Sequence, residues 1–373
     1  MVLETERRHR PPICREVPAH GPLAQRTADA ISRRMVMLAQ LVALALVLSA
    51  PQRTWSEIAV VDGDPVMRGL PRDAIPAIDR PVFTRGADAK TMSGDELVIG
   101  ITDGTTAKAY STWHLNGHEI VNDVLGTSPI AVTWCPLCFT GVVYSRQVGG
   151  RTLRFGVSGM LWRENLVMYD RETDSWWAQA AGVSIQGPLK GRTLTQLPAT
   201  MMPWREWLKQ HPETLVLSKA SPRGPEGMTD VYDTYHGSGS LGATGRMRSS
   251  KGVDPKARIA GFRLAGGAFA VDLAALAKTP VVIAEAGGQP VVLAADSRVN
   301  ARVFRAGDHA FSIRREGGER RLIDAATGSV WDPITGRALS GTLQGARLQE
   351  IPANLSYWFA WRAFFPDTTW LVK

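Results

Sequence analysis

Cys135 and Cys138 stand three positions apart, directly after the apolar run 130–134. A thiol pair at this spacing can close a disulfide, exchange one with another protein, or hold a soft metal ion, because both sulfurs can reach one point. The remaining cysteine, Cys14, lies in the leader segment described below and is not expected to be functional. The chemistry of this protein is therefore expected to gather around the CPLC string.

His118 precedes Cys135 by seventeen positions and adds an imidazole to the two sulfurs. One nitrogen and two thiolates suit copper or zinc much better than magnesium or calcium. Met168 is a weaker candidate for a fourth ligand; its thioether would favour Cu(I), although its apolar surroundings are typical of a core residue. The first prediction is a copper site, with zinc as the alternative metal, formed by His118, Cys135, Cys138 and, weakly, Met168. Nearby polar residues of the outer shell are Glu119, Asn122 and Asp123.

Two other interpretations of the cysteines stay open, and both leave the protein without a metal cofactor at this position. A structural disulfide is favoured by an oxidising compartment, but so small a loop removes little entropy from the unfolded chain. A thiol-disulfide oxidoreductase would use the same residues. Its cysteine pair normally begins a helix, whereas residues 139–145 (FTGVVYS) are typical of a strand. The sequence does not decide whether the protein is an enzyme.

Residues 1–56 are predicted to be an export signal or a disordered leader. Ser32-Arg33-Arg34 precedes the uncharged run 35–50, which is short for a membrane span and is followed by small residues suited to cleavage. The paired arginines resemble a twin-arginine signal, which exports folded proteins. We expect a periplasmic or secreted protein that touches the membrane only transiently, through this signal.

The formal charge of the whole chain is +8, and the leader holds eight Arg and four acidic residues, so the rest carries about +4. No lysine-rich run or basic stripe interleaved with aromatic residues is present, and nucleic-acid binding is not expected. The partner is predicted to be another protein or a small molecule. Twelve Trp and thirty-six Gly favour a β-rich chain with many turns.

The end of the chain repeats its middle. Residues 170–177 (DRETDSWW) align with residues 324–331 (DAATGSVW) at an offset of 154, and the upstream part aligns at an offset of 161. Two tandem copies of one β-rich unit are therefore predicted. At the positions of His118, Cys135 and Cys138 the second copy has Thr279, Asp296 and Val299, so only the first copy is expected to hold a site. The paired tryptophans occur in both copies and are read as core residues.

The predicted fold is mainly β with a few short helices. Its predicted parts are an N-terminal extension (57–94), a first repeat carrying the CPLC site (95–218), a Gly-rich connecting loop (219–255) and a degenerate second repeat (256–373). Strands are expected at 130–133, 141–145, 152–157 and 166–169, and a short helix at 203–210.

Several short motifs together resemble the bacterial and archaeal family catalogued as domain of unknown function 3179. They are AKAY (107–110), HEIVND (118–123), CPLC (135–138), GVVY (141–144), FGVSG (155–159), LVMYDRET (166–173) and WFAW (358–361). The resemblance implies a β-rich fold in secreted or membrane-anchored proteins and supplies no established reaction. One departure is Gly117, since family members tend to have Trp before this His.

Overall fold

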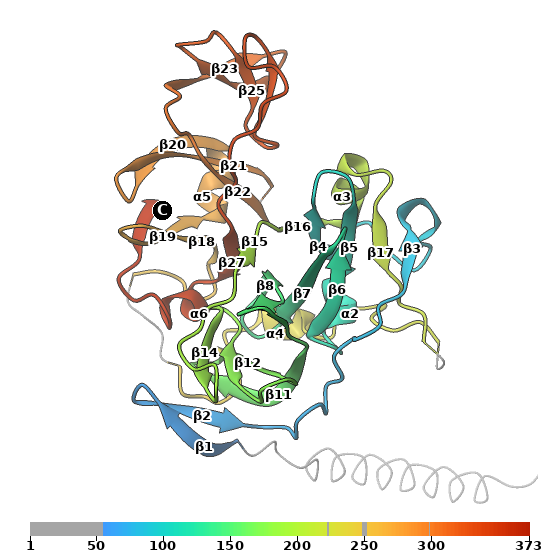
Figure 1. Cartoon of the computed structure of the whole chain (residues 1–373). Coiled ribbons are helices and arrows are strands. Elements are labelled where there is room, and N and C mark those ends of the chain that lie inside the picture. Colours follow the sequence, from blue (N-terminus) through green and yellow to red (C-terminus); the bar gives the residue numbers. More distant parts are fainter. Residues whose placement is uncertain (1–54, 222–223, 248–251, 298) are drawn as a thin grey trace, which may run out of the picture. The chain divides into compact units, whose positions relative to one another are not determined.

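Strands dominate the chain, and most pair with a neighbour in sequence as antiparallel hairpins, which matches the predicted mainly β class. The computed structural model describes residues 55–221, 224–247, 252–297 and 299–373 (Figure 1). The predicted export signal lies almost entirely outside the described residues. Residues Trp55–Lys373 form one compact unit.

The sheet that positions the candidate site has five strands in the order β16-β4-β5-β17-β3. All its neighbours are antiparallel except β17, which runs parallel to β5. The strands are β3 Phe83–Arg85, β4 Leu97–Thr102, β5 Ala107–Ser111, β16 Thr200–Pro203 and β17 Leu215–Leu217.

A larger sheet runs β28-β19-β18-β27-β8-β7-β6, with β15 added beside β8. Pairing of β27 with β8, at Leu355 and Gly141, joins the two halves of the chain within this sheet. Its strands are β6 Ile120–Leu125, β7 Ser128–Cys135, β8 Thr140–Ser145, β15 Gln196–Leu197, β18 Arg258–Leu264, β19 Gly267–Asp272, β27 Ala353–Tyr357 and β28 Thr369–Val372.

The remaining strands form four further sheets of six, two, three and four strands. The six-stranded sheet contains β1 Ser56–Val61, β2 Asp64–Arg68, β11 Phe155–Trp162, β12 Asn165–Asp170, β13 Trp176–Ala178 and β14 Val183–Gln186. The others contain β9 Gln147–Val148 with β10 Arg151–Thr152; β20 Val281–Ala286 with β21 Gln289–Ser297 and β22 Asn300–Arg305; and β23 Phe311–Glu316, β24 Glu319–Asp324, β25 Val330–Asp332 and β26 Arg337–Ser340.

The helices are short, and none among the described residues is long and apolar enough to span a membrane. They are the 3₁₀ helix η1 Gly86–Asp88 and the α-helices α2 Thr112–Leu115, α3 Trp204–Gln210, α4 Asp233–Gly237, α5 Leu273–Lys278 and α6 Trp358–Arg362. The predicted helix at 203–210 is present as α3, with Pro203 as its N-cap residue.

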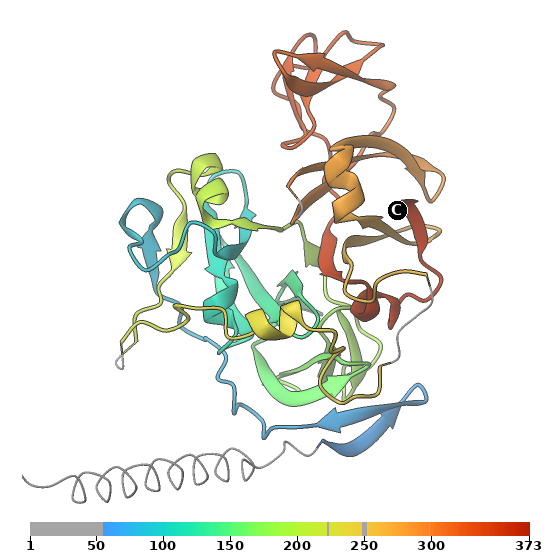
Figure 2. The same cartoon turned by 180° about the vertical axis from the view of Figure 1, so that it is seen from behind.

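Two local expectations need correction. The strand expected at 152–157 is divided, because Leu153 and Arg154 separate β10 from β11. The connecting loop also carries structure of its own: α4 lies beside the turn between β7 and β8 in both views (Figures 1 and 2), where the Tyr235 hydroxyl donates to the Leu137 carbonyl oxygen at 2.8 Å. The N-terminal extension is built into the sheets through β1, β2 and β3.

Corresponding strands of the two halves pair in corresponding registers. The order β16-β4-β5-β17 in the first half has the same directions as β27-β18-β19-β28 in the second. The central pairs are Gly100↔Ala109 and Gly100↔Thr200 in the first half, and Gly261↔Ala270 and Gly261↔Asn354 in the second. These positions differ by the offsets of 161 and 154 read from the sequence.

The tryptophans of α3 and α6 are buried, as predicted for core residues. Trp207 lies over Gly100 and donates its indole N–H to Thr214; Trp361 lies over Gly261 and donates to Thr368 in the same way. A Cβ atom at either glycine would stand about 2.4–2.5 Å from the ring above it, closer than real contacts allow.

We therefore expect Gly100→Ala and Gly261→Ala each to lower the free energy of unfolding by about 1–3 kcal/mol, because the added methyl group overpacks the site under the indole. Urea unfolding followed by tryptophan fluorescence measures this change. Gly237→Ala is the matched control, since Gly237 has open space where its Cβ would be and should change stability little. Equal effects at all three positions would contradict the packing argument.

Candidate functional site

Cys135 and Cys138 are joined by a disulfide bond, with their Cα atoms 5.3 Å apart. Cys135 ends β7, and Cys138 lies in the tight turn that leads into β8. The Cys138 N–H donates to the Cys135 carbonyl oxygen at 3.2 Å. Phe139 then adopts a φ of 53°, a left-handed conformation that directs the chain into β8. No helix follows the second cysteine, in agreement with the strand predicted there.

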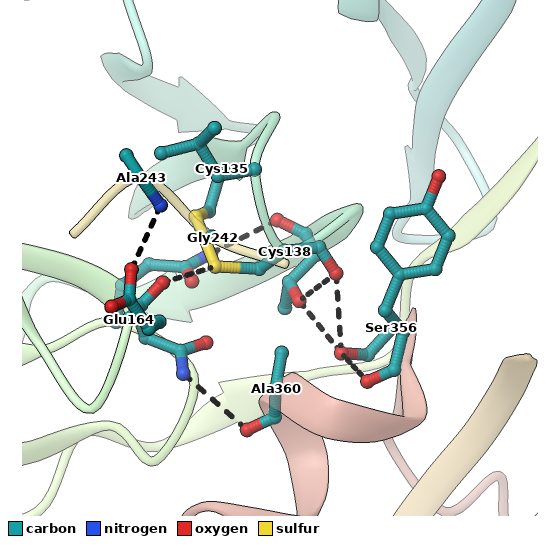
Figure 3. The surroundings of a disulfide bond; sticks show 12 residues. Cys135, Cys138, Glu164, Gly242, Ala243, Ser356 and Ala360 are labelled. Atoms are coloured by element: carbon teal, nitrogen blue, oxygen red, sulfur yellow. Dashed lines mark hydrogen bonds between the residues drawn. A yellow bond between two sulfur atoms is a disulfide. The ribbon is translucent and has the colours of Figure 1, made fainter. Parts of the chain in front are cut away.

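Three segments that are distant in sequence surround the disulfide; they contain Glu164, Gly242 and Ser356 (Figure 3). The Cys138 sulfur lies 3.3 Å from the Glu164 carbonyl oxygen, a contact rather than a hydrogen bond, since a disulfide sulfur carries no proton. The Glu164 carboxylate accepts the backbone N–H groups of Ala243 and Thr244 and the Thr244 hydroxyl. Residues 242–244 thus form a covering strap that Glu164 holds in place, and both cysteines are buried.

This arrangement changes what the two cysteines can do. Bonded to each other, they offer no thiolate to a metal ion, and exchange with another thiol requires a nucleophile to reach a buried sulfur. Of the three chemistries weighed from the sequence, the geometry favours the structural disulfide.

A different cluster could hold a cation. The side chains of His114, His118 and Glu226 each present a ligand atom within 4.8 Å of the others, and no second group of three His, Cys, Asp or Glu of this kind occurs among the described residues. The cluster includes His118 and neither cysteine, so the predicted ligand set is not brought together. Met168, the weak fourth candidate, is fully buried in β12, opposite Val157 and Trp177.

The parallel strands β5 and β17 explain how residues so distant in sequence meet. Parallel neighbours end at the same edge of a sheet, so the segments that follow β5 and β17 emerge together. β5 leads directly into α2, whose N-cap residue Ser111 accepts the His114 N–H at 3.0 Å. His118 follows in the turn before β6, and Glu226 lies on the segment after β17.

His118 is oriented as a metal-binding imidazole would be. Its Nδ1 lies 2.8 Å from the Pro76 carbonyl oxygen, which can only accept, so Nδ1 carries the proton. When the ring is neutral, Nε2 points an electron pair at the Glu226 Oε2 atom 3.2 Å away; when the ring is protonated, Nε2 donates to that oxygen. Two acceptors at this distance need a proton or a metal ion between them.

His114 stands beside His118, with the ring centroids 4.8 Å apart. Burial first, and then the neighbouring His118, lowers the pKa of His114 to about 4, so its ring is neutral at pH 7. Its Nε2 is 3.9 Å from Glu226 Oε2, and its buried Nδ1 has no hydrogen-bond partner among the described residues. A neutral, incompletely satisfied imidazole is a competent ligand.

Glu226 completes the cluster from the exposed side. Its pKa is lowered, chiefly by a hydrogen bond from Ser221 and then by one from His118, so it is a carboxylate at neutral pH. The cluster opens into a pocket of about 330 Å³ between α2 and the segment after β17. The pocket is lined by residues 76, 113–114, 116–118, 226–229 and 231.

The three polar residues predicted to surround the metal ligands lie in different environments and have different partners. Asn122 is buried, and its side chain connects β6 to two other segments. It donates to Asp79 and to the Phe155 carbonyl, and it accepts the Phe155 N–H. Asp123 accepts from Lys108 at 2.8 Å and from Tyr110 at 2.5 Å. Glu119, next to His118, is buried with a φ of 58°, and burial raises its pKa to about 8.

The chain belongs to the family of proteins of unknown function DUF3179, whose model matches residues 72–368. This confirms the resemblance read from the short motifs. No curated protein and no solved structure matches the chain.

The raised pKa of Glu119 predicts a dependence of stability on pH. Between pH 4.5 and about 8 the folded chain holds a proton that the unfolded chain has lost, so stability falls as the pH rises through this window. Glu119→Gln should remove this loss, of the order of 1–3 kcal/mol, and should have little effect below pH 4.5. Urea unfolding at pH 4.5, 6 and 8 measures it, with exposed Glu285→Gln as control. A wild-type pH profile that persists in Glu119→Gln would exclude the assignment.

Burial of the disulfide predicts slow reduction. Dithiothreitol should reduce Cys135–Cys138 much more slowly in native than in urea-unfolded protein, because the strap 242–244 denies the thiolate access. Glu164→Ala should accelerate reduction of the native protein, since the strap loses the acceptor for two backbone N–H groups. Glu172→Ala, which removes an ion pair with Arg154, is the control. Equal rates in native and unfolded protein would mean that the sulfurs are accessible. Thiol labelling and mass spectrometry follow the reaction.

Proposed function

For this member of the DUF3179 family, we propose that the folded chain binds one divalent transition-metal ion through His114, His118 and Glu226. The observation that carries the proposal is the orientation of His118. Its Nδ1 proton is held by a backbone carbonyl, while its Nε2 faces a carboxylate that cannot donate to it. Outer-shell carbonyls fix metal-binding histidines in this manner.

The donor set selects the class of metal. Two imidazoles and one carboxylate suit Zn²⁺, Cu²⁺ and Fe²⁺, and the same combination holds the zinc of several hydrolases with a fourth position left for water. Copper was predicted from two thiolates and, weakly, from the Met168 thioether. The disulfide removes the thiolates, so zinc becomes the first metal to test and Cu²⁺ the second. Three protein ligands beside a pocket leave room for a water or a small ligand on the metal.

We further propose that the protein works in an oxidising, exported compartment and that its second half is a degenerate copy of the first. The twin-arginine-like leader supports export, as does a disulfide, since such bonds persist outside the reducing cytosol. The matched registers of the two halves support the duplication. His114 and His118 are replaced in the second half by Ala275 and Thr279, so one site per chain is expected.

Zinc and copper titration calorimetry of the metal-free chain tests the proposal. Wild type should bind one equivalent. His114→Ala, His118→Ala and Glu226→Gln should each weaken binding, the histidine changes by more than the roughly 10–100-fold typical of outer-shell substitutions. Binding should also raise the unfolding temperature, by an amount that grows with the logarithm of metal concentration over Kd.

Two controls separate this site from the thiolate alternative. His309→Gln changes an imidazole that faces Asp324 elsewhere and should leave affinity unchanged. The double variant Cys135→Ala/Cys138→Ala should also keep its affinity, provided that it folds. The opposite pattern, in which the cysteine variant loses the metal and His114→Ala retains it, would replace this proposal with a thiolate copper site.

A further inference from the structure

Glu96 has a fully buried carboxylate that touches neither the pocket nor the three proposed ligands. It lies just before β4 and accepts three donors. The Lys219 ammonium lies 2.6 Å from Oε1, and the Ser111 hydroxyl donates to the same oxygen. The Ser93 N–H donates to Oε2 at 3.1 Å. Lys219 is buried as completely as Glu96. Such a pair is costly to remove from water, and its retention requires a reason.

Each main partner of Glu96 holds one ligand-bearing segment. Ser111 is the N-cap residue of α2, and its hydroxyl oxygen also accepts the His114 N–H. Lys219 begins the segment after β17: its ammonium donates to the Gly227 carbonyl at 2.8 Å, and its own carbonyl accepts the Glu226 N–H at 2.9 Å. One carboxylate therefore connects the helix of His114 to the loop of Glu226.

The two segments are also in direct contact. Gly227 has a φ of 61°, and a Cβ atom there would stand 2.4 Å from the His114 Cα. The backbone beside Glu226 consequently lies flat against the backbone of His114, and only glycine permits this approach. A small displacement of either segment changes the distance between the two ligands.

The second half of the chain shows that the fold itself does not need this carboxylate. Ala257 occupies the position of Glu96 at the offset of 161, and its carbonyl accepts the Trp358 N–H just as that of Glu96 accepts the Trp204 N–H. The backbone role is kept, while the carboxylate is missing in the half that also lacks both histidines. The buried carboxylate therefore occurs in the half that has the proposed ligands, and the same sheet forms without it in the other half.

We infer that Glu96 and Lys219 are positioning residues that pre-set His114 and Glu226 for metal binding. The inference rests on the metal site proposed above and assigns to it a buried support that neither the motifs nor the pocket lining reveals. Removing the pair should loosen residues 219–221 and 224–228 in the metal-free protein and weaken metal binding without removing a ligand.

The test uses Glu96→Gln/Lys219→Met in the full chain, which removes both charges together and keeps an acceptor for Ser111. Zinc affinity should fall at least about tenfold. Backbone amides of residues 219–221, 224 and 226–228 should exchange with deuterium faster in the metal-free protein. Circular dichroism should show an intact fold. If this double variant does not fold, Gly227→Ala, which displaces Glu226 from His114, provides the same affinity measurement.

A double-variant cycle shows whether the pair acts through Glu226. In a Glu226→Gln background, adding Glu96→Gln/Lys219→Met should reduce zinc affinity by a smaller factor than in the wild-type background, since one of the two ligands to be positioned is already lost. The matched control is Lys108→Met/Asp123→Asn, a second buried ion pair that starts from β5 and contacts neither ligand segment. It should leave zinc affinity within about twofold of wild type.

The outcomes separate the two claims. A folded Glu96→Gln/Lys219→Met protein with wild-type zinc affinity, or an equal loss in the Lys108/Asp123 control, overturns the positioning role and leaves the metal site intact. A wild-type chain that binds neither zinc nor copper overturns the proposed function, and the positioning role falls with it.

Discussion

The parallel pairing of β5 with β17 is the interaction on which the candidate site depends. It joins residues more than a hundred positions apart through only two residue pairs, Lys108 with Leu215 and Ala109 with Val216. The Trp207–Thr214 hydrogen bond and the donation from Thr214 to the Ala107 carbonyl fix the same contact from outside the sheet. Because both strands end at one edge, the histidines after β5 and the glutamate after β17 are delivered to the same place, whatever lies between them in sequence.

The sheet brings the ligand-bearing segments to one edge but does not fix the exact positions of the ligand atoms. Hydrogen bonds from polar groups around the cluster orient the side chains. The Pro76 carbonyl sets the ring of His118, and Ser111 sets the start of α2. Glu226 is the exposed member and depends most on the course of its own loop. The histidine side of the cluster is therefore fixed by a backbone carbonyl and a helix cap, and its carboxylate side by the contacts of Lys219 and Gly227.

Local sequence signals predicted much of the fold and only part of the site. Short runs rich in β-branched or aromatic residues predicted β7, β8 and β12, and the repeated tryptophans lie in the core as predicted, because these features depend on neighbours in sequence. His118 lies beside His114 and Glu226, and not in one group with the two cysteines as the sequence predicted. His114 stands four positions earlier, a readable spacing, whereas Glu226 lies 108 positions from His118 and no local pattern joins them. The sequence favoured metal binding over a structural disulfide, because so small a loop removes little entropy from the unfolded chain. In the structure both cysteines are bonded to each other and buried, which leaves no thiolate for a metal ion.

The pairing of β27 with β8 has a consequence for how the chain can be divided. A β-strand from the last quarter of the sequence covers the edge beside the CPLC turn, and the Tyr357 N–H donates to the Cys138 carbonyl oxygen at 2.9 Å. Cutting the chain between the two halves would therefore uncover the backbone at Gly141 and the Cys138 carbonyl oxygen, and leave an unpaired sheet edge beside the CPLC turn. The half without proposed ligands therefore covers part of this edge, and the half that carries the candidate site is not expected to remain soluble when it is expressed alone.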